Sequence, residues 1–370
     1  MEGHMYAARL RICRIIAVSK SVRNVLACFD FPCENQNCFE ERMQTMKVVH
    51  VGLGEHGLGW CKAIHRRDDL SLTGIVDNRK ETHVQASEFH VPCYLSLADA
   101  LMAAEPDFIV NASPPHAHFE TVKTAFLSNI PMLMEKPISE DFAEVLEMLK
   151  MVRNGQKLVI AENYRYSAQN IFAKEQLNRY LEGITSVNLV FRRHHHVPKG
   201  NYHASMKHPV IIDIGVHHFD LLRFFTCNEV RRVYAWLYTP SWSWYRGFSN
   251  AKLVANMDGG MYFNYAASLD SHMETSWFGE WTFTAENGTG FYDGSSLLFD
   301  IGGAVSKLDI PSDNGKSAKD MLLDEFFEYV RNGKPPQTDI TDQANNAAIA
   351  EAAICSNNRG CAVDVHSAFL

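Results

Sequence analysis

Two ionisable side chains in the second half of the chain have the types and spacing that proton transfer from a hydroxyl group requires. His217 follows Asp213 by four residues, within the stretch Ile212–Phe225, which reads as a helix. Side chains four residues apart lie on one face of a helix, so Asp213 would fix the tautomer of His217 and stabilise its protonated form. Histidine suits the role of base because its unperturbed pKa is about 6.5. The alternative is an N-capping aspartate and a core-facing histidine.

Lys136 is a third candidate, placed just after the apolar strand-like run Met132–Met134. A cation at the carboxyl end of a parallel strand faces the crevice in which open α/β sheets bind ligands. There it could donate a hydrogen bond to a substrate oxygen and stabilise a developing alkoxide. Pro137 restricts the backbone after the lysine, and the peptide bond between them could be cis. The alternative is an exposed surface lysine.

A glycine-rich turn predicts the cofactor that such chemistry needs. Gly52, Gly54 and Gly57 form a GxGxxG pattern between a strand and a helix, which is typical of a pyrophosphate-binding turn. Asp77, at the end of the next apolar strand, would accept hydrogen bonds from the adenosine ribose and repel a 2′-phosphate. This favours NAD over NADP, although Arg79 lies close by. A structural glycine turn with Asp77 as a strand-end cap is the alternative. The other expected cofactor contacts in these two segments are Leu53, Glu55, His56 and Asn78.

Alternating strand and helix signals predict that the first half positions these residues on a parallel sheet. The alternation implies right-handed βαβ units and a doubly wound, Rossmann-type domain over residues 46–165. Expected strands are Lys47–Gly52, Leu72–Val76, Phe108–Asn111, Met132–Met134 and Leu158–Ala161. Expected helices are Gly57–Arg67, Leu97–Ala104, His116–Leu127 and Ser139–Val152, the last with Ser139 as its N-cap.

The second half, residues 166–370, has longer and more aromatic strand-like runs separated by glycine turns. It predicts an α+β domain with a large, mostly antiparallel open sheet. The expected strand runs are Val187–Arg192, Val230–Tyr238, Lys252–Ala267 and Glu280–Ala285, and Met321–Arg331 is an amphipathic helix. Turn signals at Asp258–Gly260, Glu286–Gly288 and Asp293–Gly294 fall within or between these runs.

Composition and charge exclude several classes of function. The net charge of −8 argues against a nucleic-acid partner, and no apolar run is long enough to span a membrane. The nine cysteines include no CxxC pair, which predicts reduced thiols in a cytoplasmic protein. Residues 1–45 read as an extension outside the catalytic fold, although the basic, acid-free stretch from Ala7 to Phe29 could also be a targeting peptide.

Four motifs in a fixed order resemble one family of enzymes. They are the glycine turn, Asn111–His118, Glu135-Lys136-Pro137 and Asp213–Asp220. Together they look like the glucose–fructose oxidoreductase, inositol dehydrogenase and rhizopine catabolism family (Gfo/Idh/MocA), with a resemblance that covers residues 47 to about 365. Membership implies hydride transfer at a carbon of a sugar, an inositol or a related polyol. It also implies a homodimer or homotetramer formed through the C-terminal sheet.

The resemblance also implies roles for single residues. Lys136 would lie near the nicotinamide and the reacting hydroxyl, and Asp213 and His217 match the family's acid–base pair. Arg165 corresponds to an arginine near the substrate, although a structural salt bridge is the alternative. Further cofactor contacts would come from Ser113, Pro114, His118 and Glu135, and for His118 a helix-surface position is the alternative.

Other features leave the function open. His194, His195 and His196 lack the carboxylate partners of a metal site, so no metal is expected. The segment Lys207–Val210 departs from the family's glycine-rich lead into the Asp–His motif, which leaves the substrate undetermined. Two other functions fit the same residues. One is an enzyme that uses tightly bound NAD transiently, in an elimination or a glycoside cleavage, and the other is a dinucleotide-binding sensor.

Overall fold

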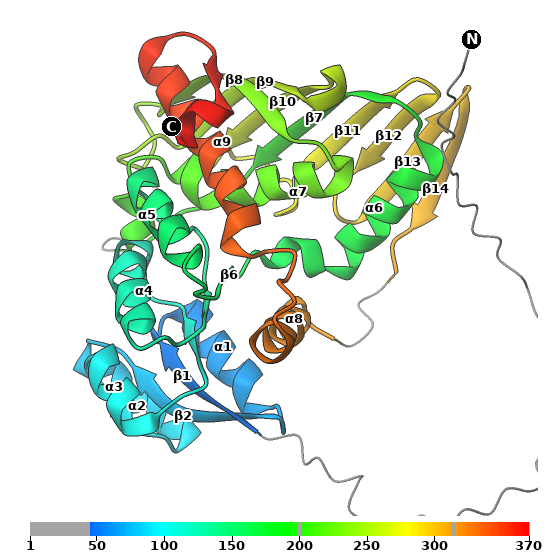
Figure 1. The fold of residues 1–370 in the computed structure, drawn as a ribbon. Coiled ribbons are helices and arrows are strands. Elements are labelled where there is room, and N and C mark those ends of the chain that lie inside the picture. Colours follow the sequence, from blue (N-terminus) through cyan, green and yellow to red (C-terminus); the bar gives the residue numbers. More distant parts are fainter. Residues whose placement is uncertain (1–44, 199–200, 312–315, 370) are drawn as a thin grey trace, which may run out of the picture. The chain divides into compact units, whose positions relative to one another are not determined.

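The structure is a computed structural model that describes residues 45–198, 201–311 and 316–369. These residues build two β-sheets with helices packed against them (Figure 1). The expected extension, residues 1–45, lies outside the described residues except for Thr45, and so do Cys13, Cys28, Cys33 and Cys38. The five described cysteines are unpaired. No described helix is long and apolar enough to cross a membrane.

The first sheet has six parallel strands in the order β3-β2-β1-β4-β5-β6. This order reverses at β1, as it does in doubly wound dinucleotide-binding folds, so the predicted Rossmann-type sheet is confirmed. The strands are β1 (Met46–Val51), β2 (Leu70–Val76), β3 (Cys93–Tyr94), β4 (Phe108–Asn111), β5 (Met132–Met134) and β6 (Leu158–Ile160). The helices between them are α1 (Glu55–His65), α2 (His83–Ala86), α3 (Leu97–Ala104), α4 (His118–Leu127) and α5 (Phe142–Val152).

The second sheet has nine strands in the order β14-β13-β12-β11-β7-β10-β9-β8-β15. Only β7 and β10 pair in parallel, which confirms the mostly antiparallel sheet. Its strands are β7 (Ile184–Arg192), β8 (Val230–Tyr238), β9 (Asn250–Met257), β10 (Tyr262–Ser268), β11 (Glu280–Ala285), β12 (Gly288–Tyr292), β13 (Ser296–Ile301), β14 (Ala304–Asp309) and β15 (Val363–Asp364). The helices of this half are α6 (Ala168–Tyr180), α7 (Val216–Thr226), α8 (Ala318–Asn332) and α9 (Ile340–Arg359).

The two faces of the second sheet differ in burial. Helices α6, α7 and α9 lie on one face (Figure 1), where side chains such as Phe191, Leu253 and Phe263 are fully buried. On the opposite face, alternate residues of β8, β9 and β10 remain exposed. Large apolar side chains in these exposed positions are Trp236, Tyr238, Val254 and Tyr262.

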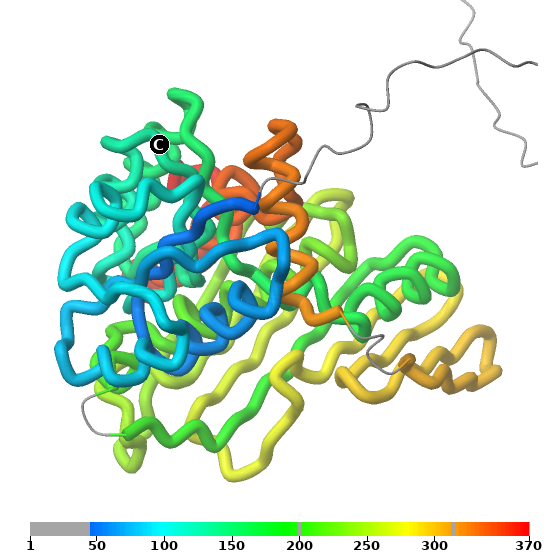
Figure 2. Tube along the Cα trace, turned by 90° about the horizontal axis from the view of Figure 1, so that it is seen from below, coloured from blue at the N-terminus to red at the C-terminus, as the bar shows by residue number. Residues whose placement is uncertain are grey.

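Helix α8 packs against the first sheet although it follows the second in sequence. Leu322, Leu323 and Phe326 belong to the same buried cluster as Val48 and Trp60. Figure 2 shows α8, in orange, beside the blue N-terminal elements. Phe326 meets Phe108 of β4 edge to face, with ring centroids 5.1 Å apart. Helix α8 therefore connects a late segment of the chain to the first sheet.

Three local expectations need correction. Helix α5 begins at Phe142 with Asp141 as its N-cap, because the Ser139 hydroxyl accepts a hydrogen bond from the Asp141 N–H instead of capping the helix. The stretch 252–267 forms two strands, β9 and β10, because Asp258–Gly260 makes the turn between them. The helix around Asp213 starts earlier and is π-helical over Val210–Gly215.

We expect Phe326→Ala to lower the free energy of unfolding by about 3–5 kcal/mol, because it removes a fully buried ring from a packed sheet–helix contact. Urea denaturation followed by circular dichroism measures the effect. Val305→Ala, at a side chain that is 72% exposed, is the control and should change the stability by less than about 0.5 kcal/mol. Equal effects of the two substitutions would contradict the docking of α8.

Candidate active site

The glycine turn follows β1 and leaves room for a ligand at one of its three glycines. A Cβ at Gly52, whose φ is +95°, would lie 2.5 Å from the Ala112 carbonyl oxygen. A Cβ at Gly57 would lie 2.0 Å from the Gly52 carbonyl oxygen, so only glycine fits this close contact between strand and helix. A Cβ at Gly54 meets nothing within 4 Å. The open space at Gly54, at the N-terminus of α1, fits a pyrophosphate.

Asp77 ties this turn to the end of β2. Its carboxylate accepts a hydrogen bond from the Leu53 N–H at 2.8 Å and pairs with the Arg79 guanidinium at 2.8 Å. Burial alone would raise the pKa of Asp77, but hydrogen bonds from Arg79 and Leu53 lower it to about 2. The carboxylate is therefore ionised. Because the Arg79 side chain is about half exposed, it can move aside for a ribose.

The loops after β4 and β5 are joined by His118. The ring is fully buried, with Nδ1 2.9 Å from the Pro137 carbonyl oxygen and Nε2 2.9 Å from the Ser113 carbonyl oxygen. Both nitrogens thus face backbone groups, so the alternative of a helix-surface position is wrong, while the contact of His118 with a cofactor stays a prediction. Ser113 itself donates to Asn111 Oδ1. In the next loop, Glu135 accepts a hydrogen bond from the Trp60 indole N–H at 2.7 Å.

Lys136 forms an ion pair with Asp213 that joins the first sheet to the helix of the second half. Its Nζ donates to Asp213 Oδ1 at 2.7 Å and to the Asp213 carbonyl oxygen at 3.2 Å, and the Lys136–Pro137 peptide bond is cis. Burial alone would lower the pKa of Lys136, but Asp213 raises it above its usual value. Burial alone would raise the pKa of Asp213, but the charge and hydrogen bond of Lys136, together with His203 and His217, lower it to about 2. Both groups are therefore charged.

His217 is held by Glu162 and not by Asp213, which corrects the sequence expectation. Its Nδ1 lies 2.7 Å from both carboxylate oxygens of Glu162, and the Tyr164 ring stacks on the imidazole at 4.1 Å. Asp213 is engaged by Lys136, and the π-helical turn departs from the four-residue periodicity that the expectation assumed. Glu162 was missed, although it follows β6 as Lys136 follows β5. Its place at a strand end was the available signal.

Burial sets the protonation of this second pair. Burial, and then the charge of Lys136, lower the pKa of His217 to about 3, so the imidazole is neutral at physiological pH. Burial raises the pKa of Glu162 to about 7, against opposing effects of Lys136 and Arg165. No described residue bonds Nε2 of His217, which leaves that nitrogen for a substrate.

Two histidines of the segment 194–203, His195 and His203, lie on the side of Asp213 away from Lys136. His203 Nε2 lies 3.4 Å from Asp213 Oδ2, and the Tyr202 ring stacks on His203 at 3.9 Å. His195 binds the Tyr245 hydroxyl through Nδ1. His194 and His196 instead pack around Trp244, and the described residues contain no cluster that could hold a metal ion.

Arg165 lies in a buried ion-pair network. Its nitrogens contact Asp220 at 2.7 Å, Asp342 at 2.9 Å and the Gln337 carbonyl oxygen at 3.2 Å. These contacts fit the alternative of a structural salt bridge, and the contact with substrate stays a prediction. Asp220, which is fully buried, also accepts hydrogen bonds from Gln343 and Asn346 of α9.

The first half of the chain, which contains the glycine turn, resembles a known family of proteins. Residues 46–163 match the model of an oxidoreductase family with an NAD-binding Rossmann fold, Gfo/Idh/MocA. Protein y4oX of Sinorhizobium fredii is 23% identical over 87% of this chain and 96% of its own. Inositol 2-dehydrogenase of Pseudarthrobacter chlorophenolicus is 25% identical over 51% of this chain and 57% of its own. The chain thus aligns with little more than half of that enzyme.

The fold is shared with solved oxidoreductase structures. An oxidoreductase from Agrobacterium radiobacter, solved with NAD+, L-tartaric acid and magnesium, superposes with a TM-score of 0.78 and 18% identity. The match covers 87% of this chain and 99% of that one.

We expect Gly54→Ala to weaken NAD binding by about tenfold or more without lowering the melting temperature of the free protein. The added methyl enters open space, so it costs no packing but occupies the path of the pyrophosphate. Isothermal titration with NAD and a thermal melt measure the two effects. Gly57→Ala is the matched comparison and should destabilise the protein outright, because its Cβ meets backbone. Unchanged NAD affinity in Gly54→Ala would place the pyrophosphate elsewhere.

Proposed function

We propose that this chain, whose residues 46–163 match the Gfo/Idh/MocA family of NAD-binding oxidoreductases, is an NAD-dependent dehydrogenase acting on a hydroxyl carbon of a small polyol, inositol or sugar. One observation carries the proposal. The Lys136 ammonium follows β5, and Glu162, which follows the neighbouring strand β6, holds the neutral His217 imidazole with its Nε2 unbonded. Alcohol oxidation needs both groups at one carbon.

The residues that would hold the cofactor are those of the turn and the neighbouring loops. Gly54 offers the space for the pyrophosphate, and Asp77 the acceptor for the adenosine ribose. NAD, when bound, supplies the hydride acceptor for oxidation. We favour NAD over NADP because Asp77 is ionised and would repel a 2′-phosphate, although the neighbouring Arg79 reduces that repulsion.

His217 and Lys136 divide the work on the substrate hydroxyl. Nε2 of His217 takes the hydroxyl proton, because the imidazole is neutral and its other nitrogen is already held by Glu162. The Lys136 ammonium stabilises the negative charge that develops on the oxygen. Asp213 keeps the ammonium charged and in place. The alcohol is oxidised to a carbonyl compound, and one proton is left on the protein at each turnover.

The exposed face of the second sheet is the surface that we propose for self-association. Trp236, Tyr238, Val254 and Tyr262 project from neighbouring strands into solvent. Apolar side chains grouped on one face mark an interaction surface. A homodimer or homotetramer would bury them. The cytoplasmic location remains a prediction from the sequence.

We expect Lys136→Met and His217→Gln each to lower kcat with a responsive polyol by about a hundredfold or more. NAD binding should persist, because neither side chain belongs to the glycine turn. A panel of inositols, aldoses and amino sugars, assayed by NADH absorbance, identifies the substrate, and the same assay then measures kcat of each variant.

Lys150→Met and His194→Gln are matched controls outside the site and should retain wild-type turnover. Full activity in either site variant would remove that residue from the chemistry. Substrate consumption without NADH formation would favour an enzyme that uses NAD transiently.

A further inference from the structure

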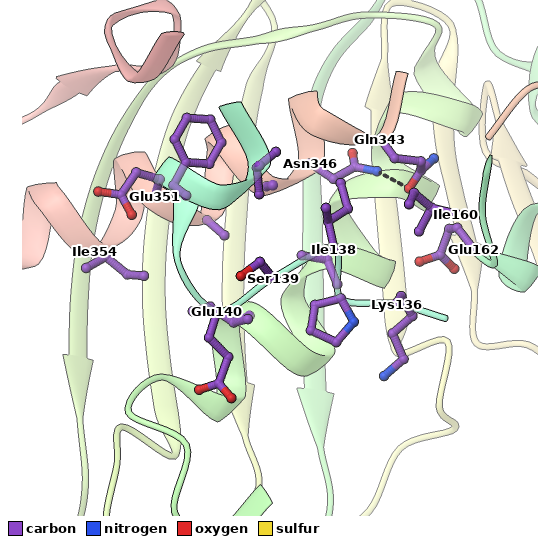
Figure 3. Close-up of a pocket in the computed structure, with 17 residues that line it drawn as sticks. Lys136, Ile138, Ser139, Glu140, Ile160, Glu162, Gln343, Asn346, Glu351 and Ile354 are labelled. Atoms are coloured by element: carbon purple, nitrogen blue, oxygen red, sulfur yellow. Dashed lines mark hydrogen bonds between the residues drawn. The ribbon is translucent and has the colours of Figure 1, made fainter. Parts of the chain in front are cut away.

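Lys136 and Glu162 line one end of a hollow in the protein. It has about 480 Å³ of empty space, part of it open to solvent, and its walls come from the loop after β5, the start of α7 and helix α9. Figure 3 shows Lys136 and Glu162 at one end and Glu140 and Glu351 at the other. Between the ends, the walls are mostly apolar side chains such as Ile138 and Ile354.

At the end lined by Glu140 and Glu351, this hollow adjoins a second hollow that is open to solvent. The second hollow has about 710 Å³ of empty space and shares Glu140, Phe142, Ile212, Glu351 and Ile354 with the first. Its other walls include the exposed side chains of Asp141 and Lys207. The two hollows together therefore connect Glu162 with the surface.

Glu162 is the one group that faces both this hollow and the base of the proposed reaction. Its carboxylate contacts Nδ1 of His217, while Nε2 of the same ring is left for the substrate. A proton that enters an imidazole at one nitrogen can leave at the other. The next carrier on that side is Glu162, since no other described group hydrogen-bonds Nδ1.

We propose that Glu162 and this hollow form a proton exit on the Nδ1 side of the His217 ring, opposite the nitrogen that faces the substrate. The inference rests on the proposed dehydrogenase function. The substrate O–H bond breaks and its proton binds Nε2 of His217. The Nδ1 proton passes to a Glu162 oxygen, and then to water in the hollow and to bulk solvent. No oxidant beyond NAD is required, since the steps after hydride transfer move only protons.

The charges around Glu162 suit a carrier that must take and release protons. Burial raises its pKa to about 7, while Lys136, Arg165 and the Tyr164 N–H lower it and Glu135 raises it further. A carrier whose pKa lies near ambient pH transfers protons readily in both directions. At the outer end, burial also raises the pKa of Glu140.

Ala347→Leu, which adds bulk to the wall of the hollow away from the catalytic groups, tests the route. Stopped-flow mixing with substrate and NAD follows NADH by absorbance and released protons with an indicator dye. We expect NADH formation in the first turnover to match wild type, while proton release slows by about tenfold and lags behind it. Glu162→Gln removes both the carrier and the partner of His217, so NADH formation and proton release should both slow in that variant. Ala103→Leu, on the exposed surface of α3, is the control and should show none.

A second readout needs no turnover. Infrared spectra of the free protein should show a carboxyl band that titrates near pH 7 and is missing in Glu162→Gln. Proton release that keeps pace with NADH in a folded Ala347→Leu protein, or a Glu162 band that titrates below pH 5, would overturn the proposal. If wild type forms no NADH with any substrate while the infrared band is present, the dehydrogenase function fails and the proton exit fails with it.

Discussion

The ion pair between Lys136 and Asp213 is the contact on which the rest of the site depends. It joins the end of β5 in the first sheet to the helical segment that packs on the second sheet, through a distance of 2.7 Å in a largely buried setting. Breaking one partner of such a pair leaves a buried charge without compensation, which is far more costly than losing a surface salt bridge. Lys136, the group that we propose to act on the substrate, therefore also holds the two halves of the site together.

The packing around this pair explains why the two halves stay together. Helix α8 returns to the first sheet and α9 supplies partners for Asp220, which also binds Arg165 at the junction. The segment after the second sheet thus contributes to the core of the first. A folded site needs both halves, because neither the ammonium nor the imidazole has its partner without the other half of the chain.

Much of this could be predicted from the sequence, because strand–helix alternation and glycine spacing are local signals. Gly52, Gly54 and Gly57 lie as expected, and Lys136 lies near the Asp213–His217 segment. The pairing of carboxylates with cations could not be predicted, since it depends on which strand ends meet in space. Glu162 is 55 residues from His217 in sequence, and the π-helical turn at Asp213 has no simple periodic signature. Arg165 and His118 also found partners that no sequence spacing indicates.

Lys136 and His217 each have their own carboxylate partner, Asp213 for the lysine and Glu162 for the histidine. This separation sets the protonation state of each pair. Asp213 is ionised and pairs with an ammonium, so it has little tendency to take a proton. Glu162 faces an imidazole that burial and the nearby ammonium keep neutral, so a proton arriving there is shared between ring and carboxylate. Had Asp213 held both Lys136 and His217, the ammonium would have competed with the imidazole for one anion. A separate partner for the histidine would let the lysine stay charged while His217, the base that we propose, gains and loses its proton.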